Sequence, residues 1–138
     1  MRIAFASDDE NETTRAVLDA LTAADHTVIR PPDGESWPDL GRFVGRAVVE
    51  GRADYGVVMC WTGTGTAIAA NKIPGVRAAT AWDPWIARGA RLWNDANVLA
   101  MSLKRLAPDL AVEVLEAFLA TTAPDPDEAA AIAALENL

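Results

Sequence analysis

The chain has 138 residues, of which 51% are hydrophobic, and carries a formal net charge of −8. That length fits a single domain with a sizeable core, and an acidic chain without a basic cluster argues against nucleic acids and anionic membranes as partners. No apolar stretch approaches the roughly 20 residues of a membrane-spanning helix. One cysteine excludes an internal disulfide and, with one histidine, argues against a metal site such as zinc. The first residues run directly into a strand pattern, so we expect no signal peptide and a cytoplasmic protein.

Strand-like and helix-like segments alternate along the chain. Short β-branched or apolar runs predict strands, and apolar residues spaced as Leu40, Val44 and Ala47 predict helices. The expected strands are 2–6, 26–30, 53–59, 76–81 and 97–102; the expected helices are 10–24, 38–50, a short helix opened by the turn after residue 60, 82–93 and 108–121. Strict alternation with short connections predicts the α/β class: one three-layer αβα, Rossmann-like domain over 1–138, with a five-stranded parallel sheet.

The segment 124–138 predicts one more helix at the end of the chain. Asp125, Pro126 and Glu128 form a capping pattern at its start. The rest of the segment is rich in alanine and can bury little apolar surface by itself. We therefore expect this helix to pack on a partner subunit.

Residues 60–72, Cys-Trp-Thr-Gly-Thr-Gly-Thr-Ala-Ile-Ala-Ala-Asn-Lys, are the most informative part of the chain. A β-branched strand ends in Cys60, and a glycine-rich turn then opens a helix of small residues. Such a turn aims backbone N–H groups at whatever lies over it, which suits an anion or a developing oxyanion. The pattern predicts a site for proton abstraction or nucleophilic attack.

Ligands of parallel α/β sheets bind beyond the carboxyl ends of the strands. The sequence assigns to that edge the following residues: Asp8 and Asp9, the turn from Cys60 through Trp61, Thr62, Gly63, Thr64 and Gly65 to Thr66, then Trp82 and Asp83, and the segment around Trp93 and Asn94. We expect these residues, which are distant along the chain, to meet in one site.

Four stretches carry a resemblance to a known family: Ile3-Ala4-Phe5 with Asp8, residues 60–72, Gly75-Val76-Arg77-Ala78, and Asn94-Asp95-Ala96-Asn97-Val98-Leu99-Ala100. With these the chain resembles the type B ribose-5-phosphate isomerases and the related subunits of galactose-6-phosphate isomerase, over most of its length up to about residue 120.

The resemblance implies an aldose–ketose isomerase that works through an enediolate without metal or organic cofactor. The family's base is a cysteine at the position of Cys60 or a glutamate at that of Thr66, so Cys60 is the candidate here. Backbone N–H groups of 62–65, with Thr62 as a catalytic residue, would hold the enediolate oxygen. Asp8 and Asn94 fall where the family contacts sugar hydroxyls. The family also implies a homodimer or higher homo-oligomer in which each site borrows residues from the neighbouring subunit.

Several departures from the family share one direction. Asp9 and Trp93 stand where the family has histidines, Trp61 stands where it has a glycine, and 106–138 hold seven acids and no Lys or Arg where the family has phosphate-binding arginines. Two unit negative charges 4 Å apart repel by roughly 4 kcal/mol at an effective dielectric constant of about 20, so a carboxylate disfavours a bound phosphate. Lys104 alone offsets this repulsion only in part. The tryptophans suit the flat or apolar face of a sugar. The substrate we expect is therefore a small, sugar-like molecule without a phosphate.

Plainer interpretations stand beside these. Cys60 can be a small buried hydrophobe, and Asp8 and Asp9 can cap the first helix. Trp85 and Trp93 can fill core space, as we expect for Trp37 and Trp82. Three functions therefore remain open: an isomerase with an unphosphorylated or unusual substrate, a catalytically inactive relative that binds a small molecule or a partner subunit, and a sugar-phosphate isomerase.

Overall fold

Five parallel strands form one sheet in the order β2-β1-β3-β5-β4. The computed structural model describes residues 1–138, and its strands are β1 Arg2–Ser7, β2 Thr27–Ile29, β3 Tyr55–Cys60, β4 Ala78–Thr80 and β5 Val98–Ser102. Because β3 lies in the centre of the sheet, its carboxyl end lies between those of β1 and β5. Cys60, the last residue of β3, is therefore at the middle of the ligand-binding edge.

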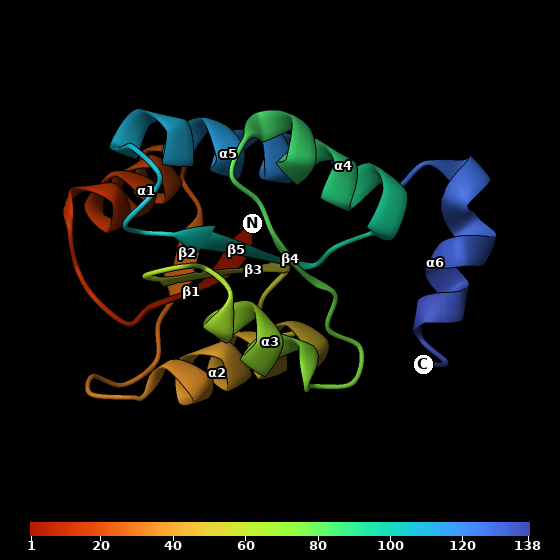
Figure 1. The fold of residues 1–138 in the computed structure, drawn as a ribbon, viewed down its shortest axis with the longest axis horizontal. Helices are drawn as coiled ribbons and strands as arrows, with labels where there is room; N and C mark the ends of the chain where they lie inside the picture. The colour runs from red at the N-terminus through yellow and green to blue at the C-terminus, as the bar shows by residue number, and fades with distance from the viewer.

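Helices cover both faces of the sheet. Figure 1 shows α1 (Glu12–Ala23), α4 (Pro84–Asn94) and α5 (Pro108–Ala120) on one face, and α2 (Trp37–Val49) and α3 (Gly65–Asn71) on the other. Successive residues of β3 face opposite layers: Val57 and Met59 pack with α1 and α5, whereas Val58 packs with α2 and α3. The three-layer αβα domain with a five-stranded parallel sheet is confirmed.

Each predicted strand and helix exists, with ends displaced by a few residues. One displacement changes an interpretation: α1 begins after Asn11, whose side chain accepts from the N–H of Thr14 while the Thr14 hydroxyl accepts from the N–H of Asn11. This reciprocal capping box leaves no capping role for Asp8 and Asp9, so the interpretation of these two residues as helix caps is wrong.

The end of the chain forms a 3₁₀ turn, Pro126–Glu128, followed by α6, Ala129–Leu135. Asp125 caps the turn rather than α6 itself, because its side chain accepts from the N–H of Asp127. No residue of α6 is buried, and Figure 1 shows the helix at the side of the domain, beside α4. Packing of this helix on a partner subunit stays a prediction. None of the helices combines the length and hydrophobicity needed to span a bilayer.

A buried arginine, which the sequence pattern did not reveal, joins α4 to the rest of the fold. The Arg91 side chain is 2% exposed; it donates to the carbonyls of Ala96 and Thr121, to the carboxylate of Asp95 and to the hydroxyl of Tyr55. Its guanidinium also lies 4.6 Å from the centre of the Tyr55 ring. Each of its three nitrogen atoms donates to a near neighbour, which offsets the cost of burying the charge.

Candidate active site

The Cys60 thiol is enclosed by the turn that follows it. Its sulfur accepts a hydrogen bond from the backbone N–H of Gly63 at 3.1 Å and from the Thr66 hydroxyl at 3.5 Å. The Thr62 hydroxyl lies 3.9 Å from the same sulfur and 2.7 Å from the Thr64 hydroxyl. Cys60 is 5% exposed, so these groups replace water as the solvation shell of the sulfur.

The hydrogen bonds decide the charge state of the thiol. Burial acts to raise the pKa of Cys60, but the hydroxyl and N–H of Thr66, the N–H of Gly63 and the hydroxyl of Thr62 outweigh it, so the net pKa is lowered. A lowered pKa favours the thiolate, the form that acts as a base or nucleophile. A cysteine that served only as a core hydrophobe would not need several donors aimed at its sulfur.

Two glycines allow the turn to adopt this shape. Gly63 has φ +76°, and a Cβ there would lie 2.7 Å from the carbonyl carbon of Met101. The turn therefore packs directly against the backbone of β5, and the Ser102 hydroxyl fixes it further by donating to the carbonyl of Trp61. At Gly65 a Cβ would lie 3.2 Å from the ring of Trp37, so Trp37 borders the glycine turn, a position that sequence reasoning missed.

The backbone donors of the turn are divided between two tasks. The N–H of Gly63 bonds the Cys60 sulfur, and the N–H of Thr64 bonds the Thr62 hydroxyl. The N–H groups of Thr62 and Gly65 make no hydrogen bond within the chain. Of the four predicted donors, two are therefore free for the oxygen of a ligand beside the thiol.

Asp8 lies directly beside Cys60 on the neighbouring strand. Ser7 pairs with Met59, and the N–H of Asp8 donates to the carbonyl of Met59 at 3.2 Å, which continues the parallel ladder and sets Asp8 opposite Cys60. Partial desolvation and, second, the charge of Asp9 raise the pKa of Asp8. The edge therefore pairs a thiol of lowered pKa with a carboxyl group of raised pKa.

Asp9, Trp61 and Lys104 form a second group at the same edge. The Trp61 indole N–H donates to Asp9 at 3.3 Å, and the Lys104 ammonium lies 4.6 Å from the centre of the Trp61 ring. Trp61 is 58% exposed, so it is held between an anion and a cation at the mouth of the site rather than packed in the core.

The remaining tryptophans also lie outside the core. Trp37, Trp82, Trp85 and Trp93 are between 39% and 68% exposed, so their interpretation as core-filling residues is wrong. Trp85 and Trp93 contact each other edge to face at 5.3 Å along α4. Gly89 lies beneath them, since a Cβ there would approach the Trp93 ring to 2.6 Å.

Asn94 does not join Cys60 in this chain. It ends α4 and leads into β5, whose first residue, Val98, pairs with Gly56. Cys60 lies four residues beyond Gly56 on β3, about 13 Å from Gly56, at the opposite edge of the sheet. The expectation that Trp93 and Asn94 meet the other site residues within one chain is therefore wrong.

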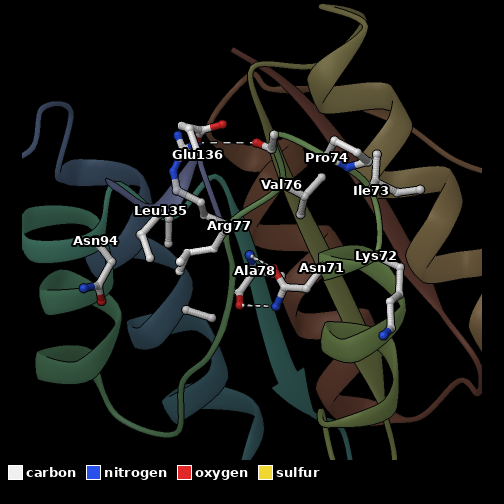
Figure 2. Close-up of a pocket in the computed structure, with 14 residues that line it drawn as sticks. Asn71, Lys72, Ile73, Pro74, Val76, Arg77, Ala78, Asn94, Leu135 and Glu136 are labelled. Carbon is white, nitrogen blue, oxygen red and sulfur yellow. Dashed lines mark hydrogen bonds and ion pairs between the residues drawn. The ribbon is translucent and has the colours of Figure 1, made fainter. Parts of the chain in front are cut away.

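Asn94 instead borders a cavity of about 680 Å³ between β4, the end of α4 and α6. Figure 2 shows Arg77 reaching toward Glu136, and Asn71 bonded to the backbone of Ala78. Asn97 likewise bonds the carbonyl of Gly75 and the N–H of Arg77. The asparagines of these two motifs thus shape the loop before β4.

A parallel α/β sheet with a hydrogen-bonded cysteine and two free backbone donors at its carboxyl edge defines an enzyme-like site for a small ligand with an oxygen that becomes anionic. The sequence pattern described as "Ribose/Galactose Isomerase" matches residues 3–135. The chain belongs to this family.

Individual relatives support membership of this family. The chain is 37% identical to the D-erythrulose-4-phosphate isomerase of Pectobacterium atrosepticum over 101 residues, which cover 72% of this chain and 65% of the relative. It is 39% identical to the ribose-5-phosphate isomerase B of Escherichia coli over 83 residues, covering 60% and 56%. The fold superimposes on ribose-5-phosphate isomerase B of Clostridium thermocellum with a TM-score of 0.88 at 33% identity, covering 99% of this chain and 96% of the other. The aligned segments thus span less than two thirds of the length of these curated relatives.

Proposed function

We propose that this protein is a cofactor-independent aldose–ketose isomerase in which Cys60 is the base. The observation that carries the proposal is the set of donors to the Cys60 sulfur, which lowers the pKa of the thiol. A base that removes a proton from carbon at neutral pH must be unprotonated yet strong enough to take the proton. A thiolate stabilised in a nearly buried position meets both needs.

The chemistry follows from the groups around the sulfur. The Cys60 thiolate removes the proton from the carbon next to the substrate carbonyl, and negative charge develops on the carbonyl oxygen. The free N–H groups of Thr62 and Gly65 stabilise that oxygen. The Thr62 hydroxyl, close to both the sulfur and Thr64, orients the substrate oxygen beside the thiol. Return of the proton to the adjacent carbon, together with transfer of a hydroxyl proton from one substrate oxygen to the other, completes the isomerisation.

The substrate we propose is a sugar or sugar-like polyol without a phosphate. Asp8 and Asp9 place two carboxyl groups at the edge of the site, and the segment 106–138 supplies no cation. Phosphate recognition ordinarily uses paired arginines. Trp37 and Trp61 instead flank the turn with aromatic surface, on which the C–H face of a neutral sugar can pack.

A sugar-phosphate isomerase is the second candidate. The names of the relatives in Pectobacterium atrosepticum and Escherichia coli specify sugar phosphates, and Lys104 puts one cation beside Trp61. A single lysine on a flexible stem binds a dianion less well than paired arginines do, which is why the unphosphorylated class is favoured.

The site is completed, we infer, by a second copy of the chain. Trp93 and Asn94 lie at the opposite edge of the sheet from Cys60, and the aromatic pair Trp85 and Trp93 is exposed on α4. In a homodimer, the α4 of one protomer can bring these residues to the Cys60 of the other. Each site would then contain groups from both chains.

Proton exchange in heavy water, followed by NMR, tests the function. The wild type, Cys60→Ala and the size-matched Cys60→Ser receive D-ribose, D-galactose, a sugar acid, ribose 5-phosphate and D-erythrulose 4-phosphate. We expect Cys60-dependent exchange at the carbon beside the carbonyl in unphosphorylated compounds. Exchange with the phosphates alone would support the second candidate. Silence throughout, with all proteins folded by circular dichroism, would contradict an isomerase and favour the inactive, ligand-binding alternative.

A further inference from the structure

We propose that Asp8 is the second proton carrier of this site, moving the hydroxyl proton between two neighbouring substrate oxygens while Cys60 moves the carbon-bound proton. The inference rests on the proposed isomerase function and goes beyond it, because Asp8 then does more than bind a hydroxyl group. Two observations support this inference: Asp8 lies beside Cys60, and the other acidic groups nearby already form hydrogen bonds or ion pairs.

Aldose–ketose isomerisation requires two proton transfers, one between carbons and one between oxygens. A histidine is the usual carrier for the second transfer near neutral pH. The single histidine of this chain, His26, precedes β2 and contacts the amino group of Met1, at the edge of the sheet opposite Cys60. The second carrier at the Cys60 edge must therefore be a group of another type.

The acidic groups near this edge are mostly engaged elsewhere. Asp9 accepts from the Trp61 indole N–H and from the N–H of Glu10. Asp83 caps α4 by accepting from the N–H of Ile86. Glu10 pairs with Arg30. Of these four acids, Asp8 alone has a carboxyl group with neither a hydrogen bond from another residue nor an ion pair.

Asp8 is also the acid that lies beside the thiol. Asp8 directly follows Ser7, the last paired residue of β1, and its N–H still bonds the carbonyl of Met59, the residue before Cys60; neighbouring strands are about 4.8 Å apart. Paired residues of parallel strands face the same side of the sheet, and Ala6 and Val58, two residues earlier, both face α2 and α3. In the proposed arrangement a substrate carbon lies at the Cys60 sulfur, and its oxygens face the Asp8 carboxyl group.

The surroundings of Asp8 favour its protonated form. Partial desolvation and, second, the neighbouring Asp9 charge raise the pKa of Asp8. Among the other charged groups near this edge, Glu10 pairs with Arg30, Asp39 pairs with Arg42, and Asp83 caps α4. Arg105 lies in the turn after β5, where its N–H bonds the Ser102 hydroxyl. Lys104 lies on Trp61 rather than on Asp8.

The transfers balance without a further reactant. The Cys60 thiolate takes the proton from C2 of an aldose while neutral Asp8 donates its proton to O1, which gives a neutral enediol. The Asp8 carboxylate then takes the proton from the O2 hydroxyl as the C2–O2 double bond forms, and the Cys60 thiol returns its proton to C1. Both residues end in their initial protonation states, and the product is the ketose.

The test compares two rates in heavy water for the panel compound that the wild type exchanges fastest: deuterium entry at the carbon beside the carbonyl, and conversion to product. Asp8→Asn keeps a hydrogen-bond donor but cannot carry the proton. We expect conversion to fall by roughly 10²-fold, with a smaller fall in exchange, so that the ratio of exchange to conversion rises about tenfold or more. Asp19→Asn, on the exposed side of α1, is the remote control and leaves that ratio as in the wild type.

An equal fall of exchange and conversion in Asp8→Asn would overturn the proposal, because it would mean that Asp8 only binds substrate. A second measurement needs no substrate and so separates this proposal from the proposed function. The ¹³C signal of the Asp8 carboxyl group is titrated and compared with that of an aspartate in an unstructured peptide. We expect Asp8 to lose its proton at higher pH than the peptide; an equal or lower midpoint would overturn the proposal even if isomerase activity is found.

Discussion

The Thr66 hydroxyl donates to the Cys60 sulfur from the first turn of α3, across a gap of 3.5 Å. Thr66 stands where one branch of the family has a glutamate as base. In this chain its hydroxyl donates to the cysteine sulfur instead. The contact links the end of β3 to the start of α3. It also gives a direct way to change the pKa of Cys60 without touching the sulfur.

Replacing Thr66 by valine is expected to raise the pKa of Cys60. Burial raises this pKa, and the variant removes the Thr66 hydroxyl, one of the donors that lower it. A lowered pKa makes the thiolate abundant at lower pH, so the pH profile of alkylation by iodoacetamide shifts to higher pH in the variant. Loss of a hydrogen bond to a charged group corresponds to about tenfold slower alkylation at pH 7. Thr66→Ser restores the wild-type profile, and Thr22→Val on α1 leaves it in place. An unshifted profile in Thr66→Val would contradict the role of this hydrogen bond.

Gly63→Ala is expected to destabilise the fold by at least about 2 kcal/mol, since it combines a strained φ with a contact against backbone atoms. The added Cβ would meet the carbonyl carbon of Met101 at 2.7 Å and the nitrogen of Ser102 at 2.9 Å. Gly34 is the matched control: its φ is +86°, and a Cβ there meets nothing within 4 Å. Urea unfolding measures both variants. Equal losses would show that only φ matters and that the turn does not pack tightly on β5.

Arg91→Met is expected to cost about 3–5 kcal/mol, because it leaves the Ala96 and Thr121 carbonyls without their donor and removes one of the two arginines that bond Asp95. Arg88→Met, on the exposed side of the same helix, makes the same chemical change with an effect below about 0.5 kcal/mol. Thermal unfolding followed by circular dichroism compares the two. Similar melting temperatures for both variants would show that the buried network adds no net stability.

Periodicity was enough to predict the sheet, its covering helices and the place of Cys60, because alternation of strands and helices allows few arrangements. It could not place Asn94. The sequence analysis assigns Trp93 and Asn94 to the same edge of the sheet as Cys60. However, α4 runs antiparallel to the strands, and its last residues therefore lie at the other edge. The sequence does not predict the burial of Arg91, because a charged residue on a helix is ordinarily exposed. Its burial follows from packing against Tyr55 and Phe118.

The donors to the Cys60 sulfur depend on backbone geometry that no residue pattern states. The sequence places Thr66 at this edge but gives no role to its hydroxyl. The division of the N–H groups of 62–65 between sulfur, hydroxyl and solvent follows from the positive φ of Gly63. The sequence predicts only packing for Trp37, which stands 23 residues before Cys60, yet the start of α2 brings it to Gly65.

Lys104 decides between the two substrate classes. If phosphorylated sugars are the substrates, Lys104→Met removes the one cation beside Trp61, and kcat/KM falls by roughly tenfold or more. For an unphosphorylated sugar we expect a change of no more than about fivefold, the size of an exposed cation–π contact. Arg88→Met is again the remote control. A large loss for neutral sugars would mean that Lys104 contacts the substrate directly.

A complementation experiment tests whether two copies of the chain share each site. Cys60→Ala and Asn94→Ala are each expected to be nearly inactive. In a mixed dimer, the protomer that keeps Cys60 faces the partner that keeps Asn94, so one of the two sites is intact. Equal mixing after dissociation gives about half mixed dimers, and hence about a quarter of wild-type activity. Mixing Cys60→Ala with Cys60→Ser restores none and serves as the control. Absence of recovery in the first mixture, with mixed dimers demonstrated by native mass spectrometry, would show that Asn94 acts, if at all, within its own chain, on the far side of the sheet from Cys60.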